Sequence, residues 1–171
     1  MKQPPTTRVL CVDDHAFLVD GLKSRLDVEP DMELVGRSPN ADHLTADVQR
    51  AGAHVVLLDI EMPGRDVFDA MDELRRRCPE VRMILLSAYV RDRYIDAAYK
   101  AGAWGYLSKS DSPEAVLAGI RKVTQGKLAF SPEVMDRFQP AAAGRRGNRL
   151  VQAGSKLGLL TLRERQVLRM I

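Results

Sequence analysis

The sequence contains few of the residues on which secreted and membrane-spanning proteins depend. Two cysteines among 171 residues are too few for a disulfide framework, so we expect reduced thiols in a cytoplasmic protein. The longest apolar runs, near 54–60 and 116–120, are far shorter than the roughly 18 residues that cross a bilayer. The opening MKQPPTTR has no apolar segment after its basic residue, so we expect neither a signal peptide nor membrane association.

Net charge is also low, at +3, yet the chain is not of a disordered type. Hydrophobic residues make up 45% of it, which is too much at this net charge for intrinsic disorder. Globular domains typically contain about 100–200 residues, so the length predicts one domain, or one domain and a fragment of another.

Charge is distributed unevenly along the chain. Residues 1–130 carry 18 basic and 20 acidic side chains, whereas residues 131–171 carry 8 and 3. The net positive charge therefore comes from the C-terminal segment. A basic tail is found in nucleic-acid-binding proteins and also in solvated linkers, and charge alone favours the linker.

Short β-branched and leucine-rich runs alternate with helical patterns over the first 130 residues. Apolar residues three apart, such as Phe68, Met71 and Leu74, indicate one face of a helix. This alternation predicts an α/β fold with a doubly wound, five-stranded parallel sheet and helices on both faces. The five predicted strands are RVLCV (8–12), MELVG (32–36), HVVLLD (54–59), RMILLS (82–87) and WGYLS (104–108).

Capping residues mark several helix boundaries. We expect Asp14 to cap one helix and Ser112 another, the second with Pro113 at its first helical position. Left-handed glycine caps are expected after three periodic segments, at Gly52, Gly102 and Gly126.

The carboxyl ends of the predicted strands carry complementary chemistry. Asp13 and Asp14 end the first strand, Asp59 the third, Ser87 the fourth and Lys109 the fifth. Ligands of open α/β sheets bind at this edge. Carboxylates gathered there repel one another unless a hard divalent cation such as Mg2+ binds them. Each residue could instead cap a helix or lie in a solvated turn, but together they predict a phosphoryl site with a carboxylate nucleophile.

Four segments, VLCVDDH, VVLLDIEMPG, ILLSAY and GAWGYLSK, together resemble the receiver domain of two-component response regulators over residues 6–128. The resemblance implies a flavodoxin-like fold that takes a phosphoryl group from a sensor histidine kinase. It implies that Asp59 is the phosphoacceptor and that Ser87 and Lys109 contact the phosphoryl group. It also implies a Mg2+ site made by Asp13, Asp14, Asp59 and the main-chain carbonyl of Glu61.

The same resemblance implies a conformational switch. Ser87 and Tyr106 match a pair in which the hydroxyl moves toward the phosphoryl group and the aromatic ring rotates inward. Ser110 stands after Lys109 where many receivers have proline, a form frequent in the NarL/FixJ-like branch. The resemblance leaves open whether the Lys109–Ser110 peptide bond is cis, which in a non-proline bond costs about 2.5–4 kcal/mol.

The predictions for the other polar residues, some of them near the site, are less specific. Glu61 and Tyr89 lie where receivers tune the lifetime of the phosphoryl group. The three histidines, His15, His43 and His54, lie far apart and show no metal-binding spacing, so we expect structural or surface roles. His15 adjoins the acidic pair and could tune it.

The C-terminal segment predicts a linker and the start of a second domain. Residues 129–158 contain a short helix, SPEVMDRF, and a basic linker rich in glycine and alanine. In the closing LTLRERQVLRMI, Thr161 and Glu164 form a capping box. Residues 159–171 resemble the first helix of a LuxR-type helix-turn-helix domain, which implies a transcription regulator that forms homodimers on phosphorylation.

The helix that would read DNA lies further on in that family. We therefore expect these 171 residues not to bind DNA sequence-specifically, and DNA binding to require the full-length protein.

Two other functions remain open. A stand-alone receiver would signal through protein contacts alone. A Mg2+-dependent phosphatase would use Asp59 as nucleophile and Glu61, two residues on, as proton donor. On the receiver interpretation the protein is not an enzyme, and its chemistry is limited to self-phosphorylation and autodephosphorylation.

Overall fold

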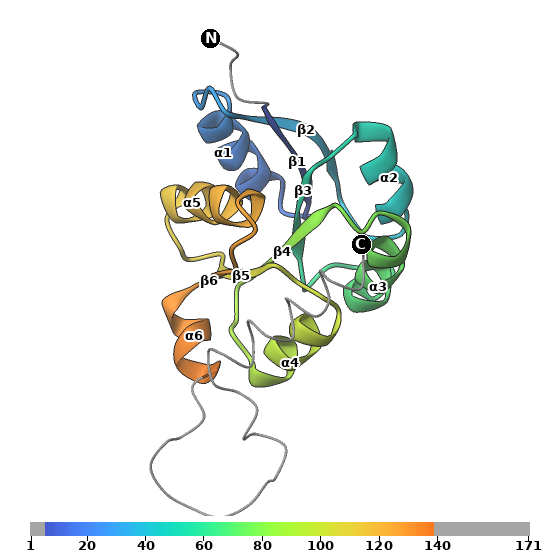
Figure 1. Ribbon diagram of the computed structural model, residues 1–171, viewed down its shortest axis with the longest axis vertical. Helices are drawn as coiled ribbons and strands as arrows, with labels where there is room; N and C mark the ends of the chain where they lie inside the picture. The colour runs from blue at the N-terminus through green and yellow to red at the C-terminus, as the bar shows by residue number, and fades with distance from the viewer. Residues whose placement is uncertain (1–5, 139–171) are drawn as a thin grey trace, which may run out of the picture. The chain divides into compact units, whose positions relative to one another are not determined.

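The structure is a computed structural model that describes residues 6–138 (Figure 1). A first compact unit ends at Ser131, and the last described helix belongs to a second unit that begins at Pro132. The elements in chain order are β1 (Thr7–Val12), α1 (Ala16–Leu26), β2 (Met32–Ser38), α2 (Leu44–Ala51), β3 (Val55–Asp59), α3 (Val67–Arg77), β4 (Arg82–Ser87), α4 (Asp92–Lys100), β5 (Gly105–Ser108), α5 (Pro113–Thr124), β6 (Ala129–Phe130) and α6 (Pro132–Phe138).

All strands run parallel in the order β2-β1-β3-β4-β5-β6. The central strand, β3, is buried along its whole length, which is why its sequence is a continuous apolar run without polar alternation. It lies between β1, with Val9 opposite Val55, and β4, with Leu57 opposite Ile84. The predicted doubly wound parallel sheet is therefore confirmed.

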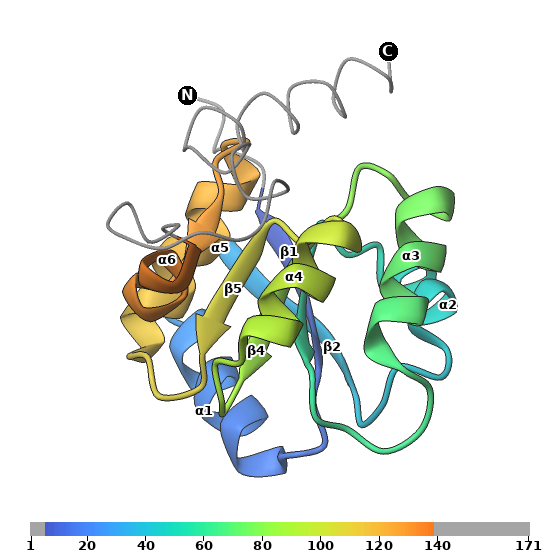
Figure 2. The ribbon, with the colours of Figure 1, turned by 90° about the horizontal axis from the view of Figure 1, so that it is seen from below.

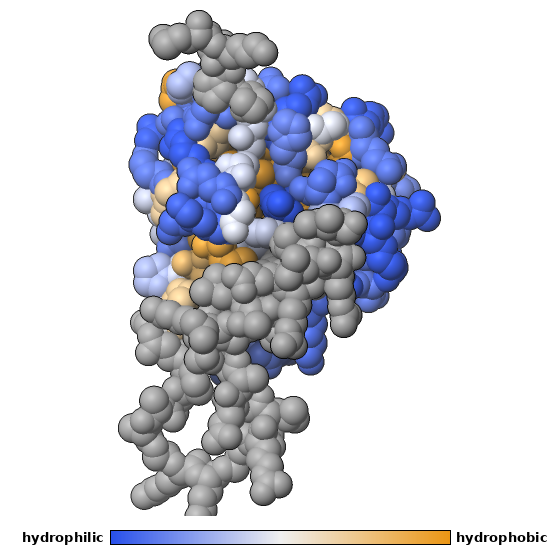
Figure 3. All heavy atoms as spheres, viewed as in Figure 1, coloured by the Kyte–Doolittle hydropathy of each residue, from blue (hydrophilic) through white to orange (hydrophobic). Residues whose placement is uncertain are grey.

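Helices cover both faces of the sheet, as predicted. Figures 1 and 2 show α1 and α5 on one face and α2, α3 and α4 on the other. On the first face Leu26 and Ile120 pack with Leu57 and Ile84 in one apolar cluster. Burying such a side chain contributes roughly 1.5–3 kcal/mol. On the other face, α2 and α3 each bury only a narrow stripe of side chains against the sheet. Hydrophilic residues cover the side of these helices that faces water (Figure 3).

The observed helix caps match the predicted capping residues in part. Ser112 caps α5 by accepting a hydrogen bond from the Ala115 N–H, and Pro113 opens the helix. The expectation that Asp14 caps the first helix was wrong. The N-cap residue of α1 is His15, which makes no side-chain capping bond, and the Asp14 carboxylate lies 3.0 Å from the His15 ring instead.

The sheet has a sixth strand that the sequence pattern missed. Strand β6 has two residues, which is too short to show alternation, and it pairs with Gly105 and Tyr106 of β5. A Cβ atom on Gly105 would lie 2.6 Å from the Ala129 carbonyl oxygen, so glycine permits the close approach of the two strands.

The Lys109–Ser110 peptide bond, whose isomer the sequence left open, is trans, because residues 6–138 contain no cis peptide bond. Two hydrogen bonds to side chains stabilise this turn: the Ser108 N–H donates to Asp111, and the Ser110 N–H donates to the Ser108 hydroxyl. In the described part of the chain, no helix has both the length and the apolar character needed to cross a membrane. Residues 139–171, which hold most of the predicted linker and the helix at 159–171, lie outside the described range.

Candidate functional site

The ladder of hydrogen bonds brings the predicted site residues to one edge of the sheet. The Asp13 N–H donates to the Ser38 carbonyl, which continues the β1–β2 pairing past the end of β1. In the same way the Lys109 N–H donates to the Ser87 carbonyl and continues the β4–β5 pairing. Asp59 is the last residue of β3, between these two pairs.

Asp13 and Asp59 are buried carboxylates that share one ammonium group. Their side chains are 0% and 1% exposed, and that of Lys109 is 11% exposed. Lys109 Nζ lies 2.8 Å from Asp13 Oδ2 and 2.7 Å from Asp59 Oδ2. Burial alone would lower the pKa of Lys109, but its close contacts with the two carboxylates outweigh burial and raise that pKa. The lysine is therefore charged, and it neutralises only one of the two acids.

Asp14 and His15 complete the acidic cluster on its solvent side. The His15 backbone N–H donates to Asp13 Oδ1 at 2.8 Å, and its ring Nδ1 lies 3.1 Å from the same oxygen. One ligand atom from each of Asp13, Asp14, His15 and Asp59 lies within 4.8 Å of all the others. The sequence interpretation, which gave His15 no place among metal ligands, missed this convergence. The adjacency of His15 to two aspartates was the signal that could have revealed it.

The donor set fits a divalent cation. The Oδ2 atoms of Asp13 and Asp59 are buried, and although both lie at ion-pair distance from Lys109 they accept no hydrogen bond of good geometry. Buried carboxylate oxygens with spare capacity are the ligands that Mg2+ and similar ions prefer. Three carboxylates against one ammonium also leave an excess of negative charge that such a cation would neutralise.

The loop after β3 is tied to Asp59. The Glu61 N–H donates to Asp59 Oδ1 at 3.1 Å, and the Glu61 side chain is exposed. Further along, Gly64 has φ +97°, and the Arg65 N–H donates to Asp42 Oδ1 at 2.8 Å. These bonds fix the backbone beside the carboxylate.

Ser87 and Tyr106 meet at a backbone atom of the β4–α4 loop. The Ser87 hydroxyl donates to the Tyr89 carbonyl at 2.8 Å, and the Tyr106 hydroxyl donates to the same carbonyl at 3.4 Å. The Tyr106 ring is fully buried, and burial raises the pKa of its hydroxyl. The shared carbonyl, which sequence patterns do not reveal, links the two predicted switch residues.

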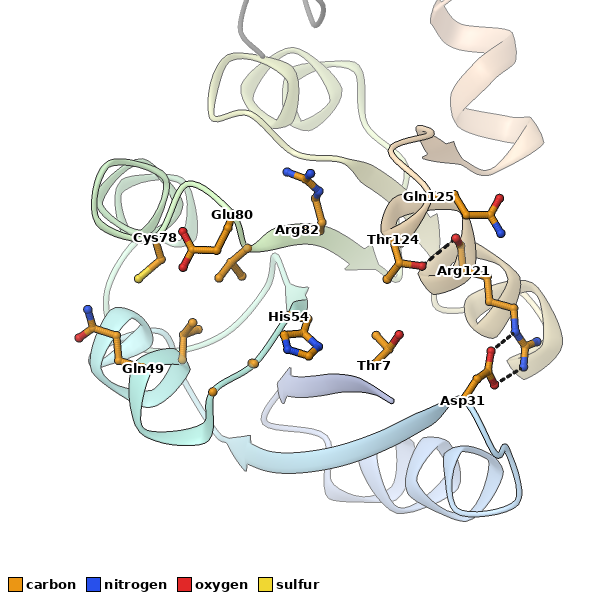
Figure 4. A pocket seen from close by; sticks show the side chains of 14 residues that line it. Thr7, Asp31, Gln49, His54, Cys78, Glu80, Arg82, Arg121, Thr124 and Gln125 are labelled. Carbon is orange, nitrogen blue, oxygen red and sulfur yellow. Dashed lines mark hydrogen bonds and ion pairs between the residues drawn. The ribbon is translucent and has the colours of Figure 1, made fainter. Parts of the chain in front are cut away.

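A cavity of about 870 Å3 lies at the opposite, amino-terminal edge of the sheet (Figure 4). Thr7, His54 and Arg82 lie around it, at the starts of β1, β3 and β4. On the far side Arg121 pairs with Asp31. None of the acidic-cluster residues lines this cavity, so the predicted phosphoryl site lies outside it.

Comparisons with known proteins agree with this geometry. Residues 9–121 match the family described as response regulator receiver domain. The chain is 26% identical over 166 residues to the response regulator protein VraR of Staphylococcus aureus, which covers 97% of this chain and 76% of VraR.

Solved structures share the fold. A two-component response regulator of the LuxR family from Aurantimonas sp. SI85-9A1 superimposes with a TM-score of 0.72 at 23% identity, covering 77% of this chain and 94% of that one. The isolated REC domain of RcsB from Salmonella enterica serovar Typhimurium, in the presence of phosphomimetic BeF3-, gives 0.70 at 21% identity, covering 77% and 98%.

Proposed function

The chain belongs to the family of response regulator receiver domains of two-component systems, and we propose that Asp59 is its phosphoacceptor. The observation that carries this assignment is the pairing of a buried Asp59 carboxylate with Lys109 at an acidic strand edge. The phosphoryl donor is a phosphorylated histidine of a sensor kinase.

In the transfer, an Asp59 oxygen forms a bond to phosphorus while the phosphorus–nitrogen bond of the donor breaks. The donor imidazole leaves with the electron pair of that bond and takes up a proton. Lys109, already 2.7 Å from Asp59 Oδ2, faces the negative charge of the transferred group. Ser87 provides a hydroxyl at the neighbouring strand end once it leaves Tyr89.

Asp13, Asp14, Asp59 and the Glu61 main-chain carbonyl would hold Mg2+. A bound Mg2+ neutralises charge that builds up between the carboxylates and the incoming phosphoryl group. The receiver family is not one of substrate-turnover enzymes, so the chemistry proposed for this chain is self-phosphorylation from small donors and slow autodephosphorylation.

The kinase would dock beside α1. Phe17 is 97% exposed, which is rare for a large aromatic side chain in a domain of this size. It lines a groove of about 350 Å3 with Leu18, Pro113 and Lys109, and Lys109 is the residue that contacts Asp59. An apolar surface next to the reacting carboxylate suits a partner that must bring its histidine to Asp59.

The output is control of transcription through a C-terminal LuxR-type domain in the full-length cytoplasmic protein, with homodimerisation on phosphorylation. Support comes from the sequence of the segment at 159–171 and from the similarity to the LuxR-family response regulator of Aurantimonas. Ser87 and Tyr106 would pass the change to the β4–α4 loop through Tyr89.

Labelling tests the assignment of Asp59. With acetyl phosphate and Mg2+, the protein should gain one phosphoryl group by intact mass, and the group should be lost at alkaline pH as expected of an acyl phosphate. Asp59→Asn should remain unlabelled, whereas Asp96→Asn, at an exposed position of α4, should label like the wild type. Persistent labelling of Asp59→Asn would overturn the assignment.

A second pair of variants tests the docking surface. Phe17→Ser should slow transfer from the phosphorylated kinase by at least about tenfold, because buried aromatic anchors dominate such interfaces. Labelling by acetyl phosphate should not depend on this surface. Val28→Ser removes another exposed apolar side chain and is the control. Equal kinase rates for the two variants would exclude Phe17 as an anchor.

A further inference from the structure

The short strand β6 is attached to the strand that carries the predicted switch tyrosine (Figure 1). Without β6 the described sheet would end at β5, and Tyr106 would lie on an edge strand. The Ala129 N–H donates to the Trp104 carbonyl at 2.9 Å. The Ser131 N–H donates to the carbonyl of Tyr106 itself at 3.0 Å. The residue that closes the β5–β6 pairing is therefore the switch residue.

Tyr106 connects this pairing to the β4–α4 loop. Its carbonyl accepts from Ser131, whereas its hydroxyl, at the other end of a fully buried side chain, donates to the Tyr89 carbonyl. Phe130 is in register with Tyr106, and side chains of paired residues in a parallel sheet point to the same face. One residue thus contacts the loop through its side chain and β6 through its backbone and its neighbour.

The bond from Tyr106 to the loop is weakened by a competitor. It is 3.4 Å long, whereas hydroxyl hydrogen bonds are typically about 2.5–3.0 Å long. The Ser87 hydroxyl donates to the same carbonyl at 2.8 Å and holds the better position. If a phosphoryl group on Asp59 draws the Ser87 hydroxyl away, the Tyr106 hydroxyl becomes the sole side-chain donor to that carbonyl. Its bond can then shorten, which fixes Tyr106 more firmly in β5.

Strand β6 is placed to respond to such a change. It has two residues and forms the edge of the sheet, and short edge segments open locally at low free-energy cost. Ser131, which is 2% exposed, is the last residue of the first compact unit, and α6 begins at Pro132. A firmer β5 therefore restrains the chain at the point where it leaves the receiver.

We propose that β6 connects the switch to the output, so that phosphorylation of Asp59 strengthens the β5–β6 pairing through Tyr106 and restrains the chain at Ser131. The inference rests on the proposed function, because it takes the phosphoryl group on Asp59 as its input. Coupling of this kind is reciprocal: whatever weakens the β5–β6 pairing must also weaken binding of a phosphoryl mimic, by the same factor.

Amide hydrogen exchange of the full 171-residue chain, with and without BeF3- and Mg2+, measures the forward effect. Exchange of the Ser131 amide should slow by at least about fivefold, the lower end of typical coupling between sites. The His54 amide, which donates to the Arg8 carbonyl at the amino-terminal edge of the sheet, is the control and reports any general stabilisation. In Tyr106→Phe, which lacks the hydroxyl, BeF3- should bind without this slowing at Ser131.

The reverse effect is measured by BeF3- affinity. Ser131→Pro removes the N–H that donates to Tyr106 and should weaken BeF3- binding by at least about fivefold. Lys127→Ala changes an exposed side chain just before β6 and should bind BeF3- like the wild type. The exchange measurement needs no variant, so it decides the question even if Ser131→Pro does not fold.

Three results would overturn the proposal. They are equal slowing at Ser131 and His54, an unchanged BeF3- affinity in folded Ser131→Pro, and a full response at Ser131 in Tyr106→Phe. Each of them leaves the phosphoacceptor assignment intact, because BeF3- still binds. Failure of the wild type to bind BeF3- would instead count against that assignment, and this proposal would fall with it.

Discussion

Removing the positive charge of Lys109 should destabilise the metal-free domain substantially. In Lys109→Met the side chain keeps its length, but the ammonium that lies 2.8 and 2.7 Å from two buried carboxylates is lost. Each contact has a Coulomb energy of about 6 kcal/mol at an effective dielectric constant of about 20. Most of that is offset by the desolvation of three charges, so the net loss is smaller. Breaking a buried ion pair by removing one partner typically costs about 3–5 kcal/mol.

Chemical denaturation without divalent cations measures the loss. Since small domains are stable by about 5–15 kcal/mol, Lys109→Met should still fold, with a clearly lower denaturation midpoint. Added Mg2+ should recover part of the difference, because the cation takes over the neutralisation of the carboxylates. Lys122→Met, at an exposed position of α5, is the matched control and should lie within about 0.5 kcal/mol of the wild type.

The pH dependence of this difference has a definite sign. The pKa of Lys109 is raised in the folded protein, so its contribution is complete below the unfolded lysine value of about 10.4 and is lost as pH rises through the raised value. The gap between wild type and Lys109→Met should therefore stay constant from about pH 6 to pH 9. A difference in unfolding free energy below about 1 kcal/mol in this range would refute the reasoning. It would show that the ammonium group contributes little to the stability of the two buried carboxylates.

Three further outcomes are expected. Gly64→Ala should destabilise the domain by about 1–3 kcal/mol in thermal unfolding, since φ is +97° and the new Cβ would lie 2.5 Å from Asp42 Oδ1, whereas Gly21→Ala in the exposed part of α1 should be neutral or stabilising. Arg121→Met should lose at most about 1 kcal/mol at pH 7, because the ion pair is partly exposed. Its hydrogen bonds lower the pKa of Asp31, so this difference should begin to fall below about pH 4 and should be lost as pH drops through the lowered pKa. Burial raises the pKa of the Cys11 thiol to about 12, so thiol reagents should modify it in the native protein far more slowly than in denaturant.

The fold could be predicted well because its strands are buried on both faces. Val55–Asp59 is a continuous apolar run, and its predicted strand differs from the observed one by a single residue. Polar residues that follow such runs must collect at one edge, which is why the sequence predicts that Asp13, Asp59 and Lys109 lie together, as they do. The sixth strand escaped because two residues cannot show a period, and its pairing depends on a tertiary contact with Gly105.

The finer geometry of the site could not be predicted, because it depends on side-chain direction. Asp14 has the residue type of a helix cap, but the helix begins after His15 and the carboxylate lies beside the acidic cluster instead. A histidine next to two aspartates has many possible rotamers, and the contacts of its ring Nδ1 with Asp13 and Asp14, at 3.1 and 3.0 Å, are seen only in the structure. Sequence spacing describes distances along the chain, whereas the ligand set of a cation depends on distances between atoms.

A short series of contacts connects the charges of this site to the proposed switch residues, Ser87 and Tyr106. Lys109 contacts Asp59 by its side chain, and its backbone N–H donates to the Ser87 carbonyl, so the residue that faces the proposed phosphoacceptor also continues the β4–β5 ladder. The Ser87 hydroxyl and the Tyr106 hydroxyl both depend on the Tyr89 carbonyl. If a phosphoryl group on Asp59 draws the Ser87 hydroxyl away, the carbonyl keeps one donor in place of two. The loop before α4 then loses a restraint, and the change in charge at a buried carboxylate becomes a change in the stability of a surface segment.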